Sequence, residues 1–212
     1  NLEYIVVDGG STDKTLKIIR KYKKYITKIV SKKDNGIYYG FNRGLSLATG
    51  DIIGIINSSD VYTKKAFKLL IKYYERHRNV DFFFGAVKKH YGILHGYRPW
   101  KIYFSWGFYS SHSTGFFIKK DAAKIVGKYN TIYKISSDYD MMLRLLYDKK
   151  IKTKYIPEVL VKMQRGGVSN QNLKSIMLKT KEDFLIMKKY NFSLLTLFNK
   201  TVRKFSQFFL RG

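Results

Sequence analysis

The 212-residue chain contains no cysteine, which excludes disulfides and thiolate metal sites and fits a reducing compartment. Within these residues we expect neither a signal peptide nor a transmembrane helix, because no apolar run approaches the roughly 20 residues that span a bilayer. Acidic residues are scarce, with 15 Asp and Glu against 41 Lys and Arg, and the net charge is +26. Such a basic surface attracts nucleic acid, anionic lipid or phosphorylated substrates without choosing among them. A genome rich in A and T, which favours lysine codons, explains part of the same charge.

The rest of the composition is that of a folded protein. Hydrophobic residues make up 45% of the chain and aromatic residues 17%, enough to bury a core. The length favours one compact domain plus a tail, which we place at residues 1–170 and 171–212.

Strand and helix patterns alternate along the chain. Apolar and β-branched runs predict strands at residues 2–7, 26–30, 51–56, 80–87 and 155–163. Helical periodicity predicts a first helix that is capped by Ser11 or Thr12 and carries Leu16 and Ile19 on one face. It also predicts helices at residues 42–48, 64–76, 138–147, 173–189 and 194–210. The run 51–56 has the pattern of a strand covered on both faces. The alternation predicts a doubly wound α/β sheet, mostly parallel and flanked by helices.

Acidic residues stand at the ends of these elements. Asp8 follows the first strand, Asp60 follows the third, and Asp138 precedes a late helix. In open α/β sheets, ligands bind at the carboxyl ends of the strands. Carboxylates at such positions can serve two purposes: they bind a divalent cation through oxygen ligands, or one of them accepts a proton from a reacting hydroxyl. One aspartate at a strand end is as readily a helix cap, so only the series indicates a site.

Longer stretches surround these acids in a fixed order. They are Val6-Val7-Asp8-Gly9-Gly10-Ser11-Thr12-Asp13, Asp34-Asn35-Gly36-Ile37-Tyr38 with Asn42-Arg43-Gly44 and Ala48-Thr49-Gly50-Asp51, Asn57-Ser58-Ser59-Asp60, His112 before Phe116-Phe117, Ser137-Asp138-Tyr139-Asp140 with Leu143-Arg144-Leu145, and Gly166-Gly167-Val168-Ser169. Over roughly residues 1–170, their order and spacing resemble the family 2 glycosyltransferases, in particular the bacterial branch that builds capsule, exopolysaccharide or lipopolysaccharide.

The resemblance implies a GT-A fold and an inverting, single-displacement transfer from a nucleoside-diphosphate sugar, preferentially a UDP-sugar, to a glycan or lipid-linked acceptor. Asp60 would hold Mg²⁺ or Mn²⁺ and Asp138 would be the general base. The donor contacts that it implies come from Asp8 (on the nucleotide base), Gly10, Ser11, Asp34, Gly36, Asn42 and Ser59. The residues that it implies near the acceptor, or in a supporting or closing loop, are His112, Asp140, Gly166 and Gly167.

Two departures from the family pattern stand out. The turn at residues 57–60 commonly carries two acids, and Ser59 replaces the first of them, which predicts weaker metal or ribose contact. The family also begins with a strand and a helix that precede Leu2, and this strand normally lies between the strands 2–7 and 51–56. Neighbouring strands sit about 4.8 Å apart, so without it the two flanking strands cannot bond to each other. We therefore expect the chain to be an N-terminally incomplete domain.

The tail has a basic amphipathic pattern, with apolar residues such as Leu194, Phe198 and Phe205 on one face and basic residues on the other. Such a helix suits an anionic membrane surface, although a helix docked on the domain fits equally. With a lipid-linked acceptor, the enzyme would be cytoplasmic and peripheral at the inner face of the plasma membrane. One rival function is a non-catalytic remnant or donor-binding subunit. A nucleic-acid-binding module is the other, but it rests on charge alone, and no nucleic-acid partner is expected.

Overall fold

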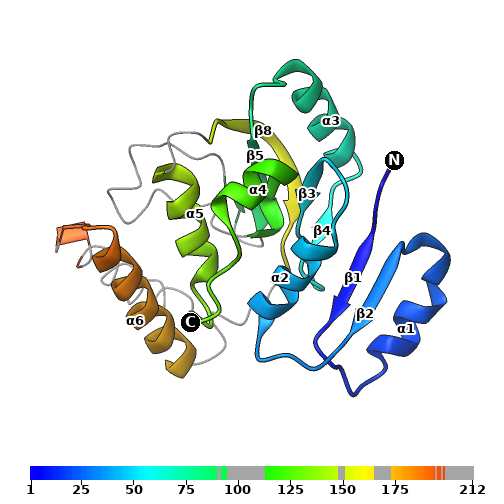
Figure 1. Cartoon of the computed structure of the whole chain (residues 1–212), viewed down its shortest axis with the longest axis horizontal. Coiled ribbons are helices and arrows are strands. Elements are labelled where there is room, and N and C mark those ends of the chain that lie inside the picture. Colours follow the sequence, from blue (N-terminus) through cyan, green and yellow to red (C-terminus); the bar gives the residue numbers. More distant parts are fainter. Residues whose placement is uncertain are drawn as a thin grey trace.

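The computed structural model describes residues 1–89, 92–94, 113–147, 151–164 and 173–193, together with Leu195, Thr196 and Phe198. Helices flank a curled sheet, and a smaller unit of β1, β2 and α1 lies at one side (Figure 1). The strands are β1 (Ile5–Asp8), β2 (Lys28–Ser31), β3 (Ile52–Gly54), β4 (Val61–Tyr62), β5 (Phe82–Lys89), β6 (Gly92–Leu94), β7 (Phe116–Lys119) and β8 (Thr153–Lys162). The helices are α1 (Thr15–Lys21), α2 (Ile37–Leu47), α3 (Ala66–Arg76), α4 (Lys120–Val126), α5 (Ser137–Tyr147) and α6 (Leu173–Lys189), with 3₁₀ turns η1 (Lys23–Tyr25) and η3 (Ser113–Gly115).

The described strands form two sheets. Strands β1 and β2 pair in parallel, with Ile5 opposite Lys28 and Asp8 opposite Ser31. The larger sheet has the order β3-β7-β5-β8-β4, and β6 pairs with β5. Strands β3 and β5 both run antiparallel to β7, and β8 runs parallel to β5, so β3, β5 and β8 share one direction. This arrangement confirms the predicted α/β class, with a parallel-rich sheet flanked by helices.

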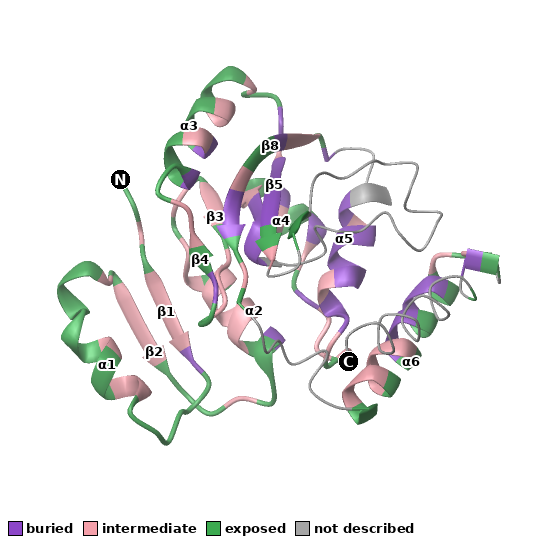
Figure 2. Cartoon of the chain, turned by 180° about the vertical axis from the view of Figure 1, so that it is seen from behind, coloured by how far each residue is buried: buried purple, intermediate pink, exposed green. Residues whose placement is uncertain are grey.

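Strand β5 forms the centre of the core. Every residue from Phe82 to Val87 is buried because both faces of β5 are covered. Phe82 and Phe84 face a cluster with α4 and α5, and Phe83 and Val87 face a cluster with α3 and β8. Alternate residues of a strand point to opposite faces, so this run of apolar residues supplies both layers. The buried residues concentrate along β5, β8 and α5 (Figure 2).

Helix α2 joins the small sheet to the rest of the molecule. A Cβ at Gly44 would lie 3.6 Å from Cγ2 of Val7, an ordinary contact distance, so α2 packs directly against β1 at this position. The Glu3 carboxylate accepts hydrogen bonds from the N–H groups of Thr49 at 2.7 Å and Gly50 at 3.2 Å, just beyond the end of α2. The pair β1–β2 is therefore held by α2 and its following turn, while β1 has no strand partner other than β2 among the described residues.

Several predicted elements differ in detail. The run 51–56 forms only the short edge strand β3, and its residues are half-buried or exposed rather than covered on both faces, because β3 pairs with β7 on one side only. Helix α2 begins at Ile37, not at residue 42, since its two interior glycines mask the helical pattern. The cap of α1 is also different: neither Ser11 nor Thr12 caps it, and Asp13 accepts the N–H of Thr15 at 2.9 Å instead.

Helix α6 has the predicted bounds and packs on α5. Tyr139 and Leu143 of α5 form a buried cluster with Ile186 and Met187 of α6, and Figure 1 shows the two helices side by side. No helix in the described part of the chain is both long and apolar enough to cross a membrane. Except for Leu195, Thr196 and Phe198, the predicted helix 194–210 lies outside the described residues.

Candidate active site

The Asp8 side chain organises the loop that follows β1. Its carboxylate is buried and accepts hydrogen bonds from the hydroxyls of Ser11 at 2.5 Å and Ser31 at 2.6 Å, and from the backbone N–H groups of Gly10 and Ser11 at 3.1 Å. The two hydroxyls and then the N–H groups hold the pKa of Asp8 below its usual range, because they favour the charged form. Gly10 has a φ of +92°, and a Cβ there would lie 2.9 Å from the Cα of Lys33. The turn therefore requires glycine at this position.

The loop after β2 lies against the Asp8 loop. The N–H of Asp34 donates to the carbonyl of Gly9 at 3.3 Å, and the Asp34 carboxylate accepts the N–H of Gly36 at 3.1 Å. A Cβ at Gly9 would lie 3.2 Å from both carboxylate oxygens of Asp34. Gly36, with a φ of +136°, is the residue from which α2 begins. The structure thus brings the two predicted donor-binding loops together.

The other predicted donor contacts lie elsewhere. Both ends of the Asn42 amide are engaged by the backbone of Tyr129, with Nδ2 donating to the carbonyl at 2.8 Å and Oδ1 accepting the N–H at 2.7 Å. Asn42 therefore ties α2 to the segment before α5. Ser59 is exposed beside Asp60. His112, Gly166 and Gly167 lie outside the described residues, and their roles stay predictions.

Asp60 belongs to a buried polar cluster between β3 and β4. Its Oδ2 accepts hydrogen bonds from the Thr114 hydroxyl at 2.8 Å and from Nδ2 of Asn57 at 3.2 Å. The same amide nitrogen also lies 2.9 Å from the Thr114 hydroxyl. Oδ1 of Asn57 is buried and has no hydrogen-bond partner. A buried oxygen without a partner beside a carboxylate offers the hard oxygen ligands that Mg²⁺ or Mn²⁺ takes. In the described residues, however, no three His, Cys, Asp or Glu side chains converge as a ligand set.

Asp138 lies in the first turn of α5 and contacts α2. Its Oδ1 accepts the N–H of Tyr139 at 2.9 Å and lies 3.3 Å from the hydroxyl of Tyr38, which also donates to the carbonyl of Ile135 at 2.6 Å. Tyr38 is two residues past Gly36, so α2 connects the Asp34 loop with Asp138. Two motifs that are about 100 residues apart in the chain, the Asp34 loop and the start of α5, are therefore linked in space by α2.

Burial controls the charge state of Asp138. Desolvation raises its pKa to about 6, against the opposing effects of the Lys179 ammonium and of the hydrogen bonds from Tyr139 and Tyr38, while Asp183 raises it further. A carboxyl group with a pKa near the working pH is suited to accept and release protons. Burial, and then the charge of Asp138, raises the pKa of the Tyr38 hydroxyl far above its usual value, so Tyr38 acts only as a neutral donor.

Asp140 is buried between two basic side chains. Its side chain is 1% exposed and forms ion pairs with Nε of Arg144 at 3.0 Å and with Nζ of Lys189 on α6 at 3.1 Å. Arg144 also donates to the carbonyl of Lys128 at 2.8 Å. These contacts tie α5 to α6 and to the segment after α4, and both oxygens of Asp140 are engaged by cations. A supporting role for Asp140 stays a prediction.

Five residues around the site were not predicted from the sequence. Tyr38 and Asn57 lie inside the motif stretches, and Thr114 lies beside one of them, so proximity to the motifs was the available signal. Lys179 and Glu182 lie in the tail segment, where a single Lys or Glu on a basic helix has no pattern that distinguishes it from a solvated residue.

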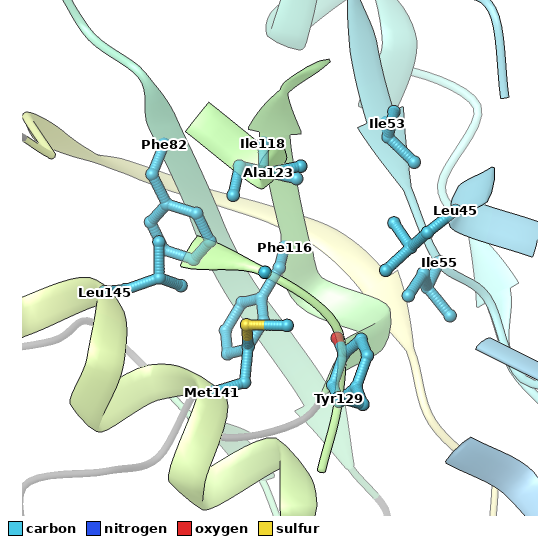
Figure 3. A pocket seen from close by; sticks show the side chains of 11 residues that line it. Leu45, Ile53, Ile55, Phe82, Phe116, Ile118, Ala123, Tyr129, Met141 and Leu145 are labelled. Carbon is cyan, nitrogen blue, oxygen red and sulfur yellow. The ribbon is translucent and has the colours of Figure 1, made fainter. Parts of the chain in front are cut away.

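An apolar pocket adjoins the site on the face of the sheet that α5 covers (Figure 3). Its lining includes Leu45 of α2, Ile53 of β3, Phe116 of β7 and Met141 of α5, and none of its lining residues is charged. Apolar walls do not compensate the charge of a diphosphate. The pocket is therefore not where the donor's diphosphate would bind.

Comparison with known proteins places the chain in a family. The profile described as Glycosyl transferase family 2 matches residues 1–141. A PGL/p-HBAD biosynthesis glycosyltransferase of Mycobacterium tuberculosis is 25% identical over 185 residues, which cover 80% of this chain and 68% of that protein. An uncharacterized glycosyltransferase of Methanocaldococcus jannaschii is 28% identical over 169 residues, covering 74% and 58%.

Solved structures share the fold. TarS of S. aureus, residues 1–349 in complex with UDP, superposes with a TM-score of 0.62 at 16% identity over 90% of this chain and 63% of that one. The mannosyltransferase PcManGT of Pyrobaculum calidifontis, in complex with GDP-Man and Mn²⁺, gives 0.61 at 17% identity over 89% and 55%. The chain thus spans less than two thirds of the solved chains that it matches. With the family profile covering most of its length, the chain belongs to glycosyl transferase family 2.

Proposed function

We propose that this protein is an inverting glycosyltransferase that moves a sugar from a nucleoside-diphosphate sugar to a hydroxyl of a glycan or lipid-linked acceptor, in the synthesis of a cell-surface polysaccharide. The observation that carries the proposal is the half-buried Asp138 carboxyl at the start of α5, contacted by Tyr38. Family membership supports sugar transfer, and neighbours of the same fold bind UDP, UDP-GlcNAc or GDP-Man.

In this mechanism, Asp138 is the general base. Its carboxylate accepts the proton of the acceptor hydroxyl as that oxygen attacks the anomeric carbon and the bond to the nucleoside diphosphate breaks. The Tyr38 hydroxyl and the N–H of Tyr139 hold Oδ1 of Asp138, which leaves Oδ2 for the acceptor. Attack from the face opposite the leaving group inverts the configuration.

The donor would lie against the Asp8 and Asp34 loops, where glycine backbone permits close approach. UDP-sugars are the donor class that we favour. Asp60, with the carbonyl oxygen of Asn57 beside it, would hold the divalent cation. When bound, the cation would neutralise charge on the leaving diphosphate. The polar cluster around Asp60 would also hold this carboxylate in a fixed orientation toward the donor.

We also propose that the intact domain has a further strand between β1 and β3. Among the described residues, β1 pairs only with β2 and β3 pairs only with β7, so each has a free edge. With that strand present, the two sheets would become one and complete the base-binding side of the donor pocket.

For the location of the enzyme, we propose the cytoplasmic face of the plasma membrane, where lipid-linked acceptors present their sugars. The net charge of +26 supports attraction to anionic headgroups. The predicted helix 194–210 would provide the membrane contact, as its basic amphipathic pattern suggests.

The test is release of nucleoside diphosphate from a panel of UDP-, GDP- and dTDP-sugars with Mn²⁺, measured for the wild type and for Asp138→Asn. We expect turnover with one donor and its loss in the variant, by about 100-fold or more, while donor binding measured by calorimetry is retained. Asp121→Asn is the matched control, because that side chain is 88% exposed on α4. Turnover that survives in Asp138→Asn contradicts the assignment of the base. Donor binding without turnover in the wild type would instead favour a binding subunit.

A further inference from the structure

Helix α6, which the sequence suggests is part of a tail, contacts the Asp138 region through buried charged side chains. Glu182 is 5% exposed, and its carboxylate accepts three backbone hydrogen bonds from the segment before α5. Oε1 accepts the N–H of Lys134 at 2.7 Å, and Oε2 accepts the N–H groups of Ile135 and Ser136 at 2.9 Å each. Three charge-assisted bonds to consecutive N–H groups fix this segment firmly.

The segment held by Glu182 is the one from which the Asp138 helix starts. The Ser136 carbonyl accepts the N–H groups of Tyr139 at 3.0 Å and Asp140 at 3.2 Å, so Ser136 initiates α5. N–H groups at a helix start usually bond to a side chain in their own segment. In α5 the N–H of Tyr139 bonds to Asp138 in this way, whereas the three N–H groups just before the helix bond to a carboxylate from another helix. The buried Ser136 hydroxyl has no hydrogen-bond partner. The position of Asp138, two residues further on, thus depends on α6.

Lys179 lies one turn before Glu182 on the same face of α6. It pairs with Asp183 at 3.8 Å, and Asp183 is buried with 3% exposure. The titratable groups that act on Asp138 come from three elements: Tyr38 of α2, Tyr129 of the segment before α5, and Lys179 and Asp183 of α6. Lys179 is the cation of this set. The charges of Asp183, Asp138 and Glu182 outweigh desolvation and raise the pKa of Lys179, so it stays protonated.

We propose that α6 positions the catalytic base: Glu182 fixes the start of the helix that carries Asp138, and Lys179, one turn before Glu182 on α6, brings a positive charge toward the Asp138 carboxylate. Both are positioning residues that act through Asp138. The proposal rests on the function proposed above. The buried contacts of α6 with Tyr139 and Leu143, and the ion pair from Lys189 to Asp140, supply the rigid attachment that such positioning requires.

The charge of Lys179 can be tested without turnover. The carboxyl carbon of Asp138 is followed by ¹³C NMR against pH, with Asp138→Asn identifying its signal. In Lys179→Met the titration midpoint of Asp138 should rise by about half a unit or more, because a nearby positive charge is lost. Lys179→Arg keeps the charge and should leave the midpoint near that of the wild type. Lys181→Met, an exposed position on the same helix, is the matched control. A Lys179→Met titration that overlays the wild type overturns the role of Lys179.

The role of Glu182 is tested by turnover. Glu182→Gln keeps the shape but not the charge or the second acceptor oxygen, so we expect kcat for nucleotide release to fall about tenfold or more with the donor KM within twofold. Glu75→Gln, exposed on α3, is the control. An unchanged kcat overturns the positioning role of Glu182. A wild type that releases no nucleotide from any donor refutes the proposed function instead, and the NMR titration still decides the role of Lys179.

Discussion

Replacing Asp138 by asparagine should stabilise the fold while removing activity. Asparagine has the same shape and keeps Oδ1 as an acceptor for the N–H of Tyr139 and the hydroxyl of Tyr38, but it carries no charge. The raised pKa of Asp138 means that folding disfavours its ionised form, chiefly because of desolvation. The substitution removes that cost wherever the wild-type carboxyl would be ionised.

The size of the gain follows from the pKa difference. The folded-state pKa is about 6 and the reference value is 3.8, a difference of about 2 units, and each unit corresponds to about 1.4 kcal/mol. The full difference is therefore about 3 kcal/mol. Part of the Asp138 side chain reaches solvent, which weakens the effect, so we expect a gain of about 1–3 kcal/mol above pH 7.

The dependence on pH gives the sharper test. A raised folded-state pKa contributes stability that is fully present below pH 3.8 and is lost as the pH rises through about 6. The advantage of Asp138→Asn should accordingly be small at pH 4, grow between pH 4 and 7, and then level off. Thermal unfolding across this range should show a Tm gain of about 2–4 °C per kcal/mol at pH 8. A gain that is equal at pH 4 and pH 8, or a loss at pH 8, would refute the reasoning.

Two further predictions concern the core and the metal. A Cβ at Gly85 of β5 would lie 2.9 Å from Cβ of the buried Leu160 and closer still to the end of its side chain, so Gly85→Ala should lower the free energy of unfolding in urea by about 2 kcal/mol or more. The control Gly44→Ala, in the interior of α2 with ordinary contacts, should be neutral or stabilising. Equal effects of the two substitutions would contradict this. Asp60→Ala should weaken Mn²⁺-dependent UDP binding by about tenfold or more in calorimetry, whereas exposed Asp51→Ala should not, and an unchanged cation dependence would exclude Asp60 as a ligand.

Local sequence patterns determined most of the helices and the longer strands. The β-branched run before Asp8 and the glycines after it predict a strand and a tight turn, because β-branched residues favour strands and glycine permits a positive φ. The periodicity of residues 138–147 and 173–189 likewise predicted α5 and α6 nearly to the residue. Helix α2 was predicted too short because Gly40 and Gly44 interrupt its apolar periodicity and have a low helix propensity.

Short strands and irregular stretches resisted prediction. Strands β4 and β7, with two and four residues, have too few positions to show a period. They form because β8, β5 and β3 offer hydrogen-bonding edges to them, which is a property of the folded sheet. The edge position of β3 also depends on the folded sheet. An apolar run predicts a central strand, but the strands and helices next to it determine how much of it is covered.

By itself, the sequence determined the family, the α/β class and the identity of the candidate acids, since each of these lies in a contiguous motif. Only the tertiary structure decided the environment of those acids. Asp138 has a raised pKa chiefly because of desolvation. Tyr38, which contacts it, and Lys179 and Glu182, which act on it or on the segment before it, lie about 40 to 100 positions away in the chain. Desolvation and charge act through space over a few ångströms, so no local pattern could show that a helix in the apparent tail contributes to the surroundings of Asp138.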